Sequence, residues 1–177
     1  MSDHGSDGPG YRPVAKGLHW VVVALLLVVL PLGAVIKFVK DDVKLSFYAV
    51  HESLGLLVLV IMLVRLAFRL ANPPPPLVGL PAPMRVAATT VHWLLYAALI
   101  AMPVSGFLAT NAWGFPLSWF GLIPVPSPIG ENKEVAPLLS TIHATLGWTI
   151  LVLFAIHLGA VLFHHVLRRD RTLYRML

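Results

Sequence analysis

The 177-residue sequence contains no cysteine. Disulfide bonds, iron–sulfur clusters, thiolate zinc sites and haem attached through a C-x-x-C-H motif are therefore excluded. Charge is also scarce: charged residues make up 12% of the chain, against about 25% in a typical soluble domain. Hydrophobic residues make up 58%. So much apolar surface excludes a disordered chain, and it could not be hidden in an ordinary water-soluble globule.

Long uncharged runs divide the chain into apolar segments. A helix needs about 20 mostly apolar residues to cross the core of a bilayer, and residues 17–36 and 135–167 contain no Asp, Glu, Lys or Arg. Residues 113–137 combine aromatic side chains with prolines, which favours a cap at the outer membrane surface. We expect residues 1–177 to form a single all-α membrane domain, an integral membrane four-helix bundle. Its helices are predicted near residues 15–38, 46–70, 86–111 and 138–167.

The Lys and Arg residues are distributed unevenly between the two ends of these helices. One end collects nine of them: Arg12, Lys16, Arg65, Arg69, Arg85, Arg168, Arg169, Arg171 and Arg175. The other end collects four: Lys37, Lys40, Lys44 and Lys133. Because cytoplasmic ends carry the excess of Lys and Arg, both termini are expected to be cytoplasmic. The net charge of +5 is then a signal of membrane topology, and no nucleic acid partner is expected.

Eight histidines are the main chemical resource, and six of them fall in or at the ends of predicted helices. His143 and His157 are 14 positions apart, which places them on nearly one face of a helix and about 21 Å apart along its axis. That spacing suits two flat cofactors stacked across a bilayer. Neutral imidazole is a natural axial ligand of haem iron. His51, near the outer end of the second predicted helix, matches the depth of His143 and is its expected partner.

The spacing leaves more than one candidate for the inner pair. His19, near the inner end of the first predicted helix, is the expected partner of His157. Their depths match imperfectly, so His92 and His164 stay open as alternative inner ligands. Intramembrane ionisable groups are functional candidates by default. We therefore interpret His92, His164 and His165 as candidate cytoplasmic proton carriers, with hydrogen-bonded interface histidines as the alternative.

Two further features lie near these histidines. Arg65 follows His51 by 14 positions, so it could pair with a propionate of the inner haem or extend to the cytoplasmic interface. The pattern H-x-x-x-G occurs at His51 to Gly55 and at His143 to Gly147. A glycine one turn beyond a ligand lets a macrocycle approach the backbone, and close helix packing is the alternative.

The ordered set of histidines across the predicted spans resembles the bacterial cytochrome b561 family of small dihaem membrane cytochromes. The resemblance covers nearly the whole chain and rests on the segment KGLHW at 16–20, His51, the Arg65 region, the proline link, His143, His157 and the pair His164–His165. It implies two haem b groups in the bacterial inner membrane. The ligands it implies are His19 with His157 on the cytoplasmic side, and His51 with His143 on the periplasmic side.

A branch of that family is similar to superoxide:ubiquinone oxidoreductases. The resemblance therefore implies an oxidoreductase that takes electrons from superoxide or another outer donor and passes them to ubiquinone near the cytoplasmic face. One alternative is a haem-bearing membrane anchor subunit of a dehydrogenase or hydrogenase. Another, from a different class, is a small proton-coupled transporter with a histidine relay. A homodimer stays an open alternative to a single copy.

Overall fold

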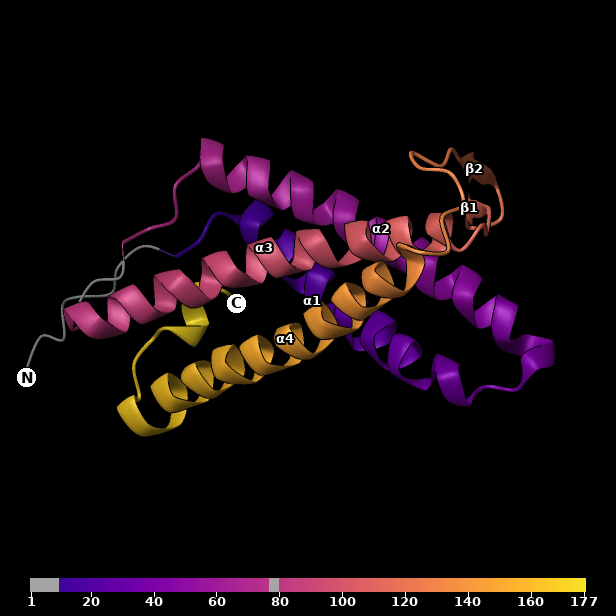
Figure 1. Ribbon diagram of the computed structural model, residues 1–177. Helices are drawn as coiled ribbons and strands as arrows, with labels where there is room; N and C mark the ends of the chain where they lie inside the picture. The colour runs from indigo at the N-terminus through magenta and orange to yellow at the C-terminus, as the bar shows by residue number, and fades with distance from the viewer. Residues whose placement is uncertain (1–9, 77–79) are drawn as a thin grey trace, which may run out of the picture.

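The computed structural model describes residues 10–76 and 80–177. Within these residues, four helices are long and apolar enough to cross a membrane. They are α1 (Pro13–Val35), α2 (Asp41–Ala71), α3 (Ala82–Ala112) and α4 (Ala136–Leu162), arranged as in Figure 1. The predicted fold class, an all-α membrane bundle, is confirmed.

Each helix begins somewhat earlier than the sequence predicts, and the residues at its start explain why. Pro13, Pro83 and Pro137 each lie in the first turn of their helix. A proline there costs nothing, because the first backbone N–H groups have no partner within a helix. Asp41 and Asp42 occupy the first turn of α2, where negative charge interacts favourably with the helix dipole.

Large apolar side chains cover the outside of the bundle. Leu27, Leu45 and Trp148 are 66%, 71% and 72% exposed. In lipid such side chains need no protein cover, since the acyl chains are as apolar as the side chains themselves. The smaller buried core draws on α1 to α4, with Val22, Val58, Tyr96 and Ile150 among its members.

The two ends of the bundle differ (Figure 1). One end, here called the termini end, holds the start of α1, the end of α2, the start of α3 and the C-terminus. Tyr11 N donates a hydrogen bond to the carbonyl oxygen of Arg175 there, at 3.0 Å. The opposite end, the hairpin end, holds the turn at Ile36–Phe38 and a β-hairpin. The nine basic residues grouped from the sequence lie near the start of α1, near the end of α2, near the start of α3 and after α4, so they belong to the termini end.

Residues 113–137, the segment expected to form the outer cap, contain a β-hairpin. Strands β1 (Leu117–Trp119) and β2 (Ile123–Val125) pair antiparallel, and Phe120 and Gly121 adopt φ angles of 51° and 70° in the turn. Ser53 of α2 anchors the hairpin. Its Oγ accepts a hydrogen bond from Phe120 N at 2.9 Å, and its carbonyl oxygen accepts one from Trp119 Nε1 at 3.0 Å.

The last helix does not end at Leu162. Residues Phe163–Arg168 continue it as one π-helical segment, a form that is frequent at functional sites. The segment ends at Arg169, whose φ of 53° is left-handed. The chain then turns back along the termini end as far as a short helix at Leu173–Arg175.

Candidate functional site

Among the described residues, two pairs of histidines face each other inside the bundle. The ring centroids of His51 and His143 are 6.1 Å apart, and those of His19 and His157 are 6.3 Å apart. A metal ion bonded at about 2 Å to one nitrogen of each of two imidazoles separates the ring centroids by roughly 6 Å. Both spacings therefore fit axial ligation of one iron by two imidazoles.

A backbone carbonyl orients each ring of the hairpin-end pair. His51 Nδ1 lies 3.1 Å from the carbonyl oxygen of Val29, and His143 Nδ1 lies 2.9 Å from that of Met102. Because a carbonyl oxygen can only accept, Nδ1 carries the proton in both rings and donates it. Nε2 is then left as the basic nitrogen of each ring, which is the arrangement that metal-ligating histidines adopt.

Two glycines let these rings reach the neighbouring backbone. Gly33 of α1 and Gly106 of α3 each follow the hydrogen-bonded carbonyl by four positions. A Cβ added to either glycine would come within 2.7 Å of Cε1 of His51 or of His143, respectively. Any side chain there would have to displace the ring, so glycine is required at both positions.

A partly open hollow adjoins the hairpin-end pair. Its lining includes both rings, Gly55, and aliphatic side chains from α1 to α4 such as Leu26, Val58, Leu99 and Ile150. An apolar wall with two convergent imidazoles is the kind of surface that a flat, mostly apolar macrocycle requires. The residues present therefore fit a haem at this level.

Arg65 lies beside the termini-end pair. Its Nη1 donates a hydrogen bond to the carbonyl oxygen of Ala15 at 3.0 Å, and its Nη2 lies 3.4 Å from His19 Nδ1. The guanidinium also lies 5.8 Å from the centre of the Tyr96 ring. The structure thus places this cation next to the histidine pair, where a cofactor carboxylate could meet it.

His92 is a third histidine at this level. Its ring centroid is 5.5 Å from that of His157, which is short for two rings on opposite sides of one iron, whereas the 6.3 Å spacing of His19 fits. In the described part of the chain, no three His, Asp or Glu side chains are arranged to hold a free metal ion. The geometry therefore favours His19 as the partner of His157, with His92 beside the pair.

The other histidines lie elsewhere. His164 Nδ1 is 2.6 Å from Asp170 Oδ2, and the His165 ring stacks edge-on with Tyr174 at 5.8 Å between centroids. Both belong to the π-helical segment Phe163–Arg168 that continues α4. His4 lies outside the described residues.

Sequence reasoning missed Gly33, Gly106 and Asp170. The two glycines do carry a weak signal, because each closely follows a proline within its helix, Pro31 or Pro103. Asp170 follows His164 by six positions, a separation that brings two side chains together only through a tight turn.

Comparisons with known proteins identify the family of this chain. Residues 10–177 match the family model described as prokaryotic cytochrome b561. The chain is 31% identical over 176 residues to cytochrome b561 homolog 2 of Escherichia coli K12, which covers 94% of this chain and 90% of that protein. It is 32% identical over 168 residues to the probable superoxide oxidase CybB of Yersinia pestis, covering 94% and 95% of the two chains. The chain therefore belongs to the prokaryotic cytochrome b561 family, which makes it a multi-pass bacterial membrane protein and implies a haem b cofactor.

Proposed function

We propose that this protein binds two haem b groups and carries electrons across the bacterial inner membrane to a quinone. One observation carries the proposal: the rings of His143 and His157, 14 positions apart on one helix, each face an imidazole from another helix at 6.1 and 6.3 Å. His51 and His143 would hold the haem at the hairpin end, and His19 and His157 the haem at the termini end. When bound, the haems supply one-electron transfer.

The residues around the two histidine pairs would bind and orient the haems and would not themselves react. The four histidines would hold the two haems, and no described residue is needed as a nucleophile, so electrons would pass between the haems and the substrates without a bond to the protein. The apolar wall of the hairpin-end hollow keeps water from the macrocycle faces. At the termini end, Arg65 would pair with a propionate, since its guanidinium already lies beside His19.

The charge distribution supports an orientation. The termini end carries nine Lys and Arg residues, so it would face the cytoplasm, and the hairpin end would face the periplasm. A quinone would then be reduced near the cytoplasmic face, at the termini end.

Superoxide is the proposed outer donor. The support is the name of one relative, a probable superoxide oxidase, together with lysines at the hairpin end that could attract a small anion. Two of these lysines are partly neutralised: Lys44 pairs with Asp41 at 2.6 Å and Lys133 pairs with Glu131 at 2.9 Å. Lys37, which lies 4.9 Å from the centre of the Phe38 ring, is a further candidate.

The test is to purify the chain alone and measure haem and turnover together. Pyridine haemochrome analysis should give two haems b per chain, and superoxide generated in the presence of a short-chain ubiquinone should yield quinol. A colourless protein, made with ample haem supply, would contradict the haem proposal and leave a transporter as the better reading. Haem-loaded protein that forms quinol only with a separate dehydrogenase or hydrogenase would identify an anchor subunit.

Quinol formation also needs protons on the cytoplasmic side. Replacing His164 and His165 together with glutamine should slow quinone reduction by about tenfold or more, a modest loss for a general acid, while both haems stay bound. Stopped-flow detection of quinol measures the rate, and the absorption spectrum checks the haems. His4→Gln, a histidine change outside the predicted helices, is the matched control. Unchanged turnover in the double variant would remove both residues from the proton path.

A further inference from the structure

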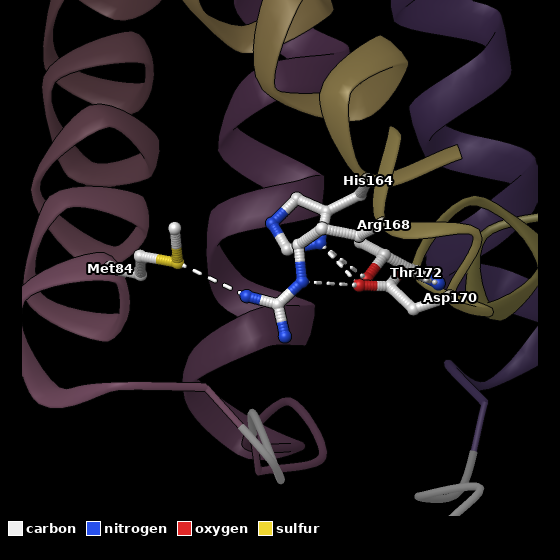
Figure 2. Close-up of polar contacts among 5 residues, drawn as sticks. All are labelled: Met84, His164, Arg168, Asp170 and Thr172. Carbon is white, nitrogen blue, oxygen red and sulfur yellow. Dashed lines mark hydrogen bonds and ion pairs between the residues drawn. The ribbon is translucent and has the colours of Figure 1, made fainter. Parts of the chain in front are cut away.

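A sharp turn after α4 closes a polar cluster around His164 (Figure 2). The left-handed residue Arg169 reverses the chain, so that Asp170 N donates a hydrogen bond to the carbonyl oxygen of His164 at 3.1 Å. The same turn brings the Asp170 side chain onto the ring, with Oδ2 2.6 Å from Nδ1 of His164. His164 and Asp170 are thereby connected twice, once between their backbones and once between their side chains.

The carboxylate of Asp170 is itself fixed in place. Thr172 N donates a hydrogen bond to Oδ1 at 3.0 Å, and Arg168 Nε lies 3.3 Å from Oδ2. The Arg168 guanidinium also reaches Sδ of Met84 on α3 at 3.3 Å, as Figure 2 shows. Partial burial alone would raise the pKa of the Asp170 carboxyl, but hydrogen bonds from Thr172 and His164 outweigh burial and hold that pKa below its usual value. Asp170 is therefore ionised at neutral pH.

An ionised partner fixes the tautomer of the ring. A carboxylate can only accept hydrogen bonds, so Nδ1 of His164 must carry a proton, and Nε2 becomes the nitrogen that gains and loses one. Only 12% of the His164 side chain is exposed. It follows His157 by seven positions, which is about two helical turns, or roughly 10 Å toward the termini end.

We propose that Asp170 is a positioning residue that keeps a proton on Nδ1 of His164, so that Nε2 delivers a proton to the quinone. This inference rests on the proposed function. Quinone becomes quinol by taking up two electrons and two protons. The two electrons would come from the haems of the proposed function. For one of the protons, the Nε2–H bond of the imidazolium breaks and an O–H bond forms on the quinone. Water at the termini end then returns a proton to Nε2.

The tautomer can be tested without any quinone. In protein labelled with ¹⁵N-histidine, the His164 ring should show a protonated Nδ1, and the signal is assigned by its loss in His164→Gln. An amide at position 170 can donate as well as accept, so Asp170→Asn should convert part or all of this ring to the Nε2–H form. The same Nδ1–H signal in both proteins would overturn the proposal.

The proton-delivery step is tested in a single turnover. Protein reduced chemically is mixed with short-chain ubiquinone, so that the outer donor has no part in the measurement. Asp170→Asn should slow quinol formation at saturating quinone by about tenfold or more, with an unchanged half-saturating quinone concentration and unchanged haem content. Asp42→Asn, the same chemical change at an exposed position of α2, should leave the rate unaltered. An unaltered rate in Asp170→Asn would overturn the proposal.

A double substitution separates positioning from a structural role. If Asp170 acts through His164, adding Asp170→Asn to His164→Gln should cost nothing further, because coupled residues are not additive. A second, equal loss in the double variant would mean that Asp170 only stabilises the turn, and would overturn the proposal. Wild-type protein that keeps both haems but yields no quinol would instead overturn the proposed quinone function, and the tautomer measurement would still judge the role of Asp170.

Discussion

Replacing either His51 or His143 with alanine should remove the same haem and leave one haem per chain. In the proposed function each ring would supply one of two ligands to this haem, and each ring is hydrogen-bonded to its own backbone carbonyl, Val29 or Met102. A haem with one protein ligand in an apolar site loses both the bond and the orientation that the second ring provides. Pyridine haemochrome analysis should therefore fall from two haems to one for both variants.

A redox titration identifies which haem is lost. The remaining haem in His51→Ala and His143→Ala should titrate at one shared potential, and the haem left in His157→Ala should titrate at the other. His165→Ala, whose ring contacts Tyr174 instead of another histidine, should keep both haems. Loss of different haems from His51→Ala and His143→Ala would refute their pairing.

The placement of His143 and His157 on one face of α4 could be predicted because it depends on local regularities. Hydropathy locates the span, and the helical period then places His143 and His157 on nearly one face at two depths. The charged residues at the helix ends also predict how deep His51 lies in the membrane. None of these steps requires knowing how the helices pack against one another.

The depth of His19 was harder to judge, and the structure gives the reason. Lys16 looks like the end of a helix, yet α1 begins at Pro13. The ammonium group of Lys16 donates a hydrogen bond to the carbonyl oxygen of Leu177 at 2.5 Å. Trp20 Nε1 donates one to the carbonyl oxygen of Met176 at 3.0 Å. The returning C-terminal segment therefore covers the start of α1, and α4 extends past His157 far enough for the two rings to meet.

The glycines that escaped prediction depend on which faces of distant segments meet. Of the two H-x-x-x-G glycines, Gly55 lines the hollow. Gly147 instead lies in close packing, since a Cβ there would be 3.3 Å from Met102 Cε. The same pattern thus has two outcomes. Gly33 and Gly106 lie against the rings of His51 and His143, and each glycine belongs to a different helix from its ring.

Replacing Gly106 with valine should therefore remove the hairpin-end haem as completely as loss of His143 itself. The added Cβ would lie 2.7 Å from Cε1 and 2.9 Å from Nδ1 of that ring, so the ring must move away. Movement breaks the Nδ1 hydrogen bond to Met102 and turns Nε2 away from its bonding direction, since this bond sets the ring orientation. The helix itself tolerates valine, which is a better helix former than glycine.

The haem content of Gly106→Val should fall to one per chain, with the termini-end haem retained at its own potential. Gly33→Val should behave in the same way, because its Cβ would be 2.7 Å from Cε1 of His51. Gly159→Ala is the matched control on a helix, since a Cβ there meets nothing within 4 Å. A Gly106→Val protein with two haems and an unaltered spectrum would show that the ring can shift without losing iron. The carbonyl and the glycine would then not define the ligand geometry, and bis-imidazole ligation would have to be held by the haem pocket alone.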